Sequence, residues 1–131
     1  MIHRLASPAQ LAARVTEPDM AGLVSPDFDA AAWLVEPGNI ALTDGHNMML
    51  FEALPEAVWR GHWLLRDRGR KAFLTAADFL RYVYALHGAL IIVGLVPAHR
   101  RASRWFTRQM GFVSGGVVDT EHGPQEFFSM T

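Results

Sequence analysis

The sequence predicts an α/β fold in which one mixed, mostly antiparallel sheet of about six strands carries helices on both faces. Three observations support this fold class. Short alternating segments joined by turns fill residues 39–65, a long amphipathic helix follows, and a continuous apolar segment comes next. A meander followed by a helix and a buried strand is typical of a sheet with one parallel pair joined by a crossover helix.

The size and composition of the chain fit a single domain over residues 1–131. Half of these residues are hydrophobic and 19% are charged, which is enough apolar material for a core and unlike a disordered chain. No cysteine is present, so disulfide and thiolate chemistry are excluded. The N-terminus lacks the apolar run of a signal peptide, and residues 88–96, the most apolar window, are about half as long as a membrane-spanning helix. We therefore expect a cytoplasmic protein that does not enter a membrane.

Two short helices are predicted in the first 38 residues. Ser7-Pro8 has the N-cap and first-position preferences of a helix, which would extend to about residue 15. Asp27 or Asp29 can cap a second helix that ends before Pro37. The segment between the two helices is interrupted by proline and glycine, and we expect it to be irregular.

Three antiparallel strands are predicted next. Asn39–Thr43 is the first, and Asp44-Gly45 favours a two-residue hairpin turn after it. The second strand would cover His46–Leu54, and the third would cover Ala57–Leu65. Alternation in the third strand places four residues on one face: Val58, Arg60, His62 and Leu64.

A long helix and a buried strand follow. Apolar residues at spacings of three and four predict a helix over Arg70–Leu86, and His87-Gly88 has the residue types that end one. Ala89–Val96 is apolar without alternation, which is typical of a strand covered on both faces.

A second helix and a closing hairpin complete the fold. The helix would end at Gly111, with an inward stripe formed by Ala98, Ala102, Trp105, Phe106 and Gln109 or Met110. Phe112–Val118 and Gln125–Met130 would then pair around a turn at Glu121–Pro124, at one edge of the sheet.

Positive charge is concentrated in two clusters. The net charge is −1, but residues 1–56 contain two arginines and eight carboxylates, whereas residues 57–131 contain ten cations and five carboxylates. Eight of these cations are Arg66, Arg68, Arg70, Lys71, Arg100, Arg101, Arg104 and Arg108. Each cluster lies where a strand ends and a helix begins, and helix N-termini present free N–H groups. A solvated basic face is the ordinary interpretation, but this arrangement around Gly69 also suits a pyrophosphate.

These residues resemble those of a known family. The turn Arg66-Asp67-Arg68-Gly69-Arg70-Lys71 resembles the Arg/Gln-x-x-Gly-x-Gly/Ala turn of the GCN5-related N-acetyltransferases (GNAT). The run Leu95–Phe112, which closes with Gly111-Phe112, is similar to their strand end, helix and final Gly-Phe. The order of elements fits over about residues 39–131, with residues 1–38 as a compressed helical region. The chain looks especially like the short acetyltransferase-like proteins encoded by tailed bacteriophages.

The resemblance implies a sheet splayed between strands Ala57–Leu65 and Ala89–Val96, with acetyl-CoA as cosubstrate in the gap. An amine acceptor would arrive from the opposite side. The turn would bind the pyrophosphate, while the backbone of the preceding strand would pair with the pantetheine and polarise the thioester carbonyl. The implied cofactor-binding residues are Leu64, Leu65, Arg66, Arg68, Gly69, Arg70, Lys71, Ala72, Arg100, Ser103 and Arg104.

Three positions depart from the family pattern. Lys71 replaces a small residue, and Arg100 stands where the family usually has a helix-starting asparagine. Thr107 stands where many members have the tyrosine that protonates the departing thiolate, and Ser103 could substitute for it by residue type.

His62 is the candidate general base. Histidine ordinarily titrates close to neutral pH and can take a proton from an ammonium acceptor. Glu52, on the neighbouring strand, is a weaker candidate, because a carboxylate there is more often a solvated edge charge.

Three functions follow from these observations. The first is acetyl-CoA-dependent N-acetylation of an unspecified amine by direct attack on the thioester. The second is a non-catalytic protein of the same fold, assembling with itself or in a phage particle, in a host cytoplasm or virion; Arg100 and Thr107 favour it. The third and least favoured is nucleic-acid binding through the arginine clusters, which would weaken steeply with salt. The histidines lack metal-ligand spacing, so no metal is expected.

Overall fold

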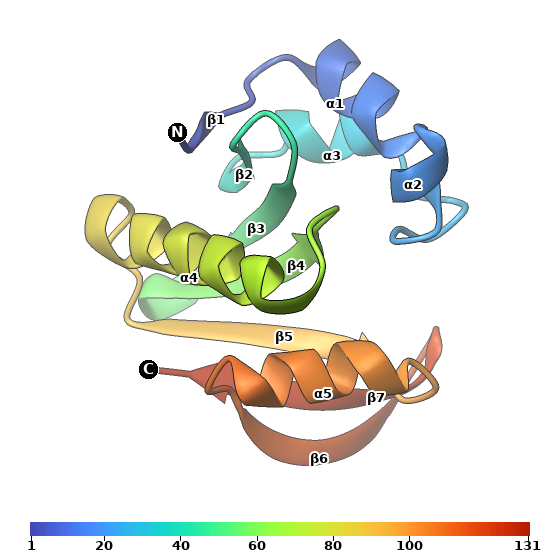
Figure 1. Cartoon of the computed structure of the whole chain (residues 1–131), viewed down its shortest axis with the longest axis vertical. Helices are drawn as coiled ribbons and strands as arrows, with labels where there is room; N and C mark the ends of the chain where they lie inside the picture. The colour runs from blue at the N-terminus through green and yellow to red at the C-terminus, as the bar shows by residue number, and fades with distance from the viewer.

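The computed structural model describes all 131 residues as one seven-stranded sheet with helices on both faces (Figure 1). The strands are β1 (His3–Arg4), β2 (Asn39–Thr43), β3 (Met48–Leu54), β4 (Val58–Leu64), β5 (Ile91–Pro97), β6 (Val113–Thr120) and β7 (Gly123–Met130). The helices are α1 (Pro8–Val15), α2 (Pro18–Ala21), α3 (Ala30–Val35), α4 (Gly69–Leu86) and α5 (Arg101–Gln109), with a 3₁₀ turn η1 at Pro55–Ala57.

The strand order is β1-β2-β3-β4-β5-β7-β6, and only β4 and β5 are parallel. The parallel pair lies at the centre because α4 crosses over the sheet between the two strands. The predicted fold class is therefore confirmed. The sheet gains one strand, since β1 adds two residues beside β2.

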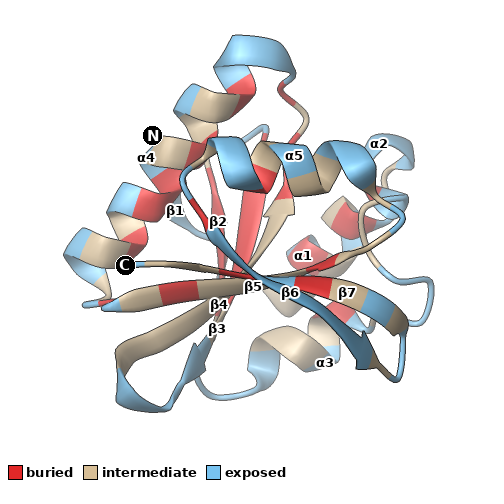
Figure 2. Ribbon diagram, turned by 90° about the horizontal axis from the view of Figure 1, so that it is seen from below, coloured by how far each residue is buried: buried red, intermediate tan, exposed pale blue.

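A hydrophobic core lies on each face of the sheet. Phe79 of α4 packs with Phe51 and Ile92 on one face, beneath α4 and α5. Leu11 of α1 packs with Met48 on the other face, beneath α1–α3. Buried residues follow the middle strands and the inner sides of the helices (Figure 2). Each fully buried side chain of this size contributes about 1.5–3 kcal/mol to folding.

Side-chain caps begin the N-terminal helices, as the sequence predicts. Ser7 Oγ accepts a hydrogen bond from the Gln10 N–H at 3.2 Å, and Asp29 Oδ1 accepts one from the Ala32 N–H at 3.1 Å. The segment expected to be irregular contains the short helix α2. Pro18 begins this helix, because proline has no N–H to leave unpaired there.

The loop between β2 and β3 is longer than predicted. Thr43 pairs with Met48, so the loop is the four residues Asp44–Asn47 rather than a two-residue turn. The carboxylate of Asp44 accepts two hydrogen bonds from backbone N–H groups of the loop, at 2.7 and 2.9 Å. The second strand therefore begins two residues later than expected.

The burial predicted for the strand β5 was wrong in part. In β5, Ile92 and Val96 are buried in the core on one face, but Ile91, Val93 and Leu95, which alternate onto the other face, are only half-buried. Leu90, expected in the buried strand, precedes β5 and is 67% exposed.

The inward stripe of α5 is displaced from the predicted one. Thr107 is buried, while Trp105 is 56% exposed. Ala102 and Gln109 are also exposed. Arg104 and Arg108 of the helix pair with a buried carboxylate on β7, Glu126. Trp105 instead lies edge-on to Phe73 of α4, with ring centroids 5.8 Å apart.

Candidate functional site

The parallel strands β4 and β5 separate halfway along their length. Their register pairs Val58 with Ile91 and continues only to Arg60 with Val93. Beyond this point β4 remains paired with β3, and β5 remains paired with β7. The backbone edge of residues 61–64 therefore faces the edge of residues 94–97 with no strand between them.

A cleft of about 540 Å³ occupies this gap and is lined by residues from both faces of the sheet. Its volume lies within the range of pockets that bind cofactors and small substrates. On the face covered by α5 the lining residues include Trp63, Ser103, Thr107 and Phe112. On the face covered by α3 they include Phe28, Trp33, Glu52, Arg60 and His62.

Two helices begin at the same end of this gap, because β4 leads into α4 and β5 leads toward α5 (Figure 1). Gly69 opens α4 with a positive φ of 61°, a conformation that glycine adopts without strain. Arg70 and Lys71 follow it and are exposed, whereas Ala72 is buried. The N–H groups of the first turn of α4 are thus accompanied by two exposed cations.

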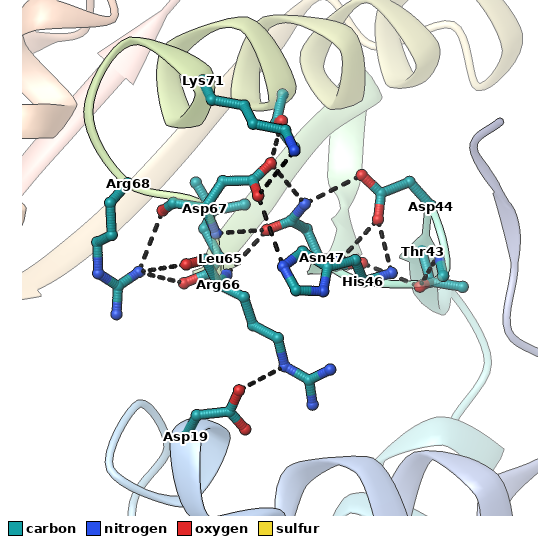
Figure 3. Close-up of polar contacts among 12 residues, drawn as sticks. Asp19, Thr43, Asp44, His46, Asn47, Leu65, Arg66, Asp67, Arg68 and Lys71 are labelled. Carbon is teal, nitrogen blue, oxygen red and sulfur yellow. Dashed lines mark hydrogen bonds and ion pairs between the residues drawn. The ribbon is translucent and has the colours of Figure 1, made fainter.

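Asn47 holds the turn between β4 and α4 in place (Figure 3). Its side-chain oxygen accepts hydrogen bonds from the backbone N–H groups of Arg66 at 2.8 Å and Asp67 at 3.0 Å. Its amide group donates to Asp44 Oδ2 at 3.1 Å and to Asp67 Oδ2 at 3.0 Å. Every hydrogen-bonding capacity of this buried amide is used. The role of Asn47 could not be predicted from the sequence, because the pattern of residues 46–54 places it in a strand.

Asp67 is the buried anion of the basic turn. Thr75 Oγ1 donates to its Oδ2 at 2.8 Å, and this hydrogen bond is the main cause that lowers the pKa of Asp67. Asn47, Lys71 and His46 lower the same pKa further, with Lys71 Nζ 3.7 Å and His46 Nε2 3.5 Å from Oδ1. The charge of Asp67 therefore offsets part of the surrounding cluster.

Arg66 and Arg68 also have partners inside the molecule. Arg66 forms ion pairs with Glu17 and Asp19 of the N-terminal region, its Nε lying 2.9 Å from Asp19 Oδ2 (Figure 3). Arg68 Nη1 donates to the carbonyl of Leu65 at 2.8 Å and to two other carbonyls of the turn at 3.1 Å. These two arginines stabilise the turn and attach it to α2.

Two of the four arginines in the second cluster, Arg104 and Arg108, are paired with Glu126. Arg104 Nε lies 2.6 Å from Glu126 Oε1, and Arg108 pairs with the other carboxylate oxygen, as does the Ser114 hydroxyl. Burial alone would raise the pKa of Glu126, but the hydrogen bond from Ser114 and the two arginines lower it overall. This network attaches α5 to β7.

His62 and Glu52 form a polar pair in the cleft. His62 Nε2 lies 3.1 Å from Glu52 Oε1, with side-chain exposures of 35% and 28%. The hydrogen bond with His62 is the main cause that lowers the pKa of Glu52, and Arg60 nearby lowers it further. Glu52 is therefore not a solvated edge charge. This pairing was missed because it joins the two strands diagonally.

The remaining predicted residues lie around the cleft. Leu64 lines it and is buried, as is Leu65. Arg100 and Ser103 line it from the α5 side, and Arg100 Nη2 also donates to the carbonyl of Gly22 at 2.9 Å. The Thr107 hydroxyl donates to the carbonyl of Ser103 at 2.8 Å.

No group of three or more histidine, aspartate and glutamate side chains is placed to hold a metal ion. The helices are all too short or too polar to span a membrane.

Comparisons by sequence give no match, either to protein-family models or to curated proteins. Comparison by structure gives several matches. The aminoglycoside acetyltransferase AAC(6')-Ib, solved with coenzyme A and kanamycin, matches all of this chain and 94% of its own at a TM-score of 0.77 and 11% identity. Aminoglycoside 6'-acetyltransferase type Ii matches all of this chain and 96% of its own, with a TM-score of 0.68 and 18% identity.

A third similar structure comes from Desulfovibrio desulfuricans and is described as an acetyltransferase of the GNAT family. It covers 99% of this chain and 97% of its own, with a TM-score of 0.75 and 16% identity. All three likenesses extend over almost the whole of both chains. Together with the separated β4–β5 pair, they show that this chain has the GNAT acetyltransferase fold.

Proposed function

We propose that this protein transfers the acetyl group of acetyl-CoA to an amine acceptor by direct attack on the thioester. The observation that carries the proposal is the unpaired backbone edge of residues 61–64, which faces a cleft that ends at two helix N-termini. A peptide-like pantetheine arm can pair with such an edge, as an added strand would. The GNAT fold, present in a structure solved with coenzyme A, supports the same assignment.

In this proposal the pyrophosphate binds at the first turn of α4. The free N–H groups of Gly69–Ala72 face an anion favourably at the positive end of the helix dipole. Arg70 and Lys71 are exposed and add charge, although Lys71 also pairs with Asp67 at 3.7 Å, whereas the less exposed Arg66 and Arg104 are paired with carboxylates. The main phosphate ligands would thus be this backbone and two cations, with Arg68, Arg100 and Ser103 around them.

His62 would act as the general base. The low pKa of Glu52 keeps its carboxylate ionised, so it accepts the proton of His62 Nε2 and leaves Nδ1 free to take a proton from the amine. Glu52 would also stabilise the imidazolium that forms. As the C–N bond forms, the C–S bond breaks and releases a thiolate that needs a proton.

Ser103 is the candidate donor of that proton. It lines the cleft, and its hydroxyl makes no hydrogen bond within the protein. The Thr107 hydroxyl, by contrast, already donates to a carbonyl of its own helix.

The hydrogen bond that occupies the Thr107 hydroxyl also favours a second candidate function. A protein of this fold without an efficient proton donor could bind coenzyme A and act in assembly without turnover. Binding and turnover must therefore be measured separately.

Thermal unfolding with acetyl-CoA, coenzyme A and a short DNA duplex tests the proposal. We expect both coenzymes to raise the midpoint, since a ligand at 100 times its Kd stabilises by about 2.7 kcal/mol, and the duplex to have no effect at physiological salt. An assay of free thiol with a panel of amines then measures turnover. No shift with either coenzyme would contradict the proposal, whereas shifts without turnover would favour the second function.

A further inference from the structure

Arg60 lies in the part of the cleft that faces α3. It is two residues from His62 on the same strand, so both side chains point to the same face of the sheet. Glu52 is its direct cross-strand neighbour on β3. The carboxylate of Glu52 is nevertheless hydrogen-bonded to His62, and it forms no ion pair with Arg60.

The guanidinium of Arg60 forms no hydrogen bond and no ion pair in the molecule, although its charge lowers the pKa of the neighbouring Glu52. Its Nε is shielded from solvent and makes no hydrogen bond. The Nε of Arg66 likewise makes no hydrogen bond, but it lies 2.9 Å from Asp19 Oδ2 in an ion pair, which Arg60 lacks. Arg68, Arg100 and Arg104 all donate to carbonyl or carboxylate oxygens. A half-buried charge without a partner costs free energy, and arginine is suited to bidentate contact with a carboxylate.

We propose that Arg60 binds a carboxylate of the acceptor, so that the acceptor is a small amino carboxylate. This inference rests on the acetyltransferase function proposed above. Residues two apart on a strand are separated by about 7 Å, so a carboxylate at Arg60 leaves the amine of a small amino acid within reach of His62. Phe28 and Trp33, with ring centroids 6.1 Å apart, line the same part of the cleft and would pack against an apolar side chain of the acceptor.

A polycationic acceptor is the opposing interpretation, because an acidic hollow adjoins the cleft beyond Trp33. It is lined by Asp27, Asp29 and Glu36. Two of these carboxylates have local roles: Asp27 accepts a hydrogen bond from Ser25, and Asp29 caps α3. A polyamine in the cleft would also place positive charge beside the unpaired Arg60. The local charges therefore favour the carboxylate.

Acetylation of matched acceptors tests the inference. We would compare L-phenylalanine with L-phenylalaninamide, and include spermidine and kanamycin as polycations. The variant Arg60→Gln should raise KM for phenylalanine about 10- to 100-fold, as expected for loss of a charge-assisted hydrogen bond, and leave KM for the amide nearly unchanged. The amines of phenylalanine and of its amide differ in pKa. Because each acceptor is compared between the variant and wild type, this difference does not affect the result. Arg81→Gln, in an exposed pair with Asp78, is the matched control and should change neither value.

Binding of the product gives a second readout if turnover is slow. Calorimetry with the coenzyme A complex should detect N-acetylphenylalanine with wild type and not with Arg60→Gln. The variant should fold normally, since the guanidinium forms no hydrogen bond or ion pair, and thermal unfolding checks this. Equal effects of the variant on phenylalanine and its amide, a preference of wild type for polycations, or product binding unaffected by the variant would each overturn the inference. Those results would leave the acetyltransferase function intact, whereas absence of coenzyme A binding would remove both.

Discussion

Asn47 shows how one amide determines the geometry of the turn that precedes α4. Its side-chain oxygen accepts hydrogen bonds from the backbone N–H groups of Arg66 and Asp67, and its amide nitrogen donates to the carboxylates of Asp44 and Asp67. Replacing it with alanine would leave two buried N–H groups and a buried carboxylate without these partners.

We expect Asn47→Ala to lower the free energy of unfolding by about 2–4 kcal/mol, because unmade buried hydrogen bonds are costly. Urea denaturation measures this. Asn39→Ala is the matched control, since the Asn39 amide makes one side-chain hydrogen bond, to the Trp33 carbonyl, and should cost about 1 kcal/mol. Equal losses in the two variants would show that Asn47 has no special role.

The His62–Glu52 pair also depends on single side chains, and substitutions of each test its role. We expect His62→Ala to lower kcat by about 100-fold or more and Glu52→Gln by a smaller factor, with KM for acetyl-CoA unchanged, because general-base catalysis typically contributes at least this much. His99→Ala is the control, since His99 lines the cleft without a carboxylate partner. Activity of His62→Ala within a few-fold of wild type would exclude the histidine as the base.

At the scale of elements, α5 depends on the buried carboxylate of β7. The pKa of Glu126 is lowered in the folded protein, so its stabilising contribution is complete above the unfolded value of about 4.3 and is lost as pH falls below that value. We expect Glu126→Gln to be less stable at pH 7 and to lose less stability than wild type between pH 5 and 3. Denaturation at a series of pH values measures this, and parallel acid limbs for the two proteins would contradict it.

Local signals predicted the elements well. The caps at Ser7 and Asp29 and the 3.6-residue periodicity of α4 act over a few residues, so α1, α3 and α4 could be located from the sequence. Contacts between residues that lie far apart in the sequence could not be predicted from it. The turn carbonyls that hold Arg68, the carboxylates that hold Arg66 and Arg104, and the Glu52–His62 pair all depend on which strands and helices become neighbours. The candidate site could therefore be predicted from the sequence only to the level of its elements, and both its location and the roles of its individual residues remain predictions.

At the scale of the whole molecule, uneven charge serves to hold the fold together. The acidic N-terminal region meets the basic remainder through the ion pairs of Arg66 with Glu17 and Asp19, and Arg100 reaches Gly22 beside them. Because the arginine clusters are partly used in this way, they offer less free positive charge than their number suggests. This favours a coenzyme site over nucleic-acid binding.

The central claim is that coenzyme A binds in the gap between β4 and β5 with its pyrophosphate at the start of α4. Titration of ¹⁵N-labelled protein with coenzyme A, followed by amide chemical shifts, tests this most directly. The account predicts the largest shifts at residues 61–65 and 69–72, and a weaker affinity for the double variant of Arg70→Ala and Lys71→Ala but not for Arg81→Ala. Unchanged spectra, or shifts confined to β6 and the exposed side of α5, would contradict it.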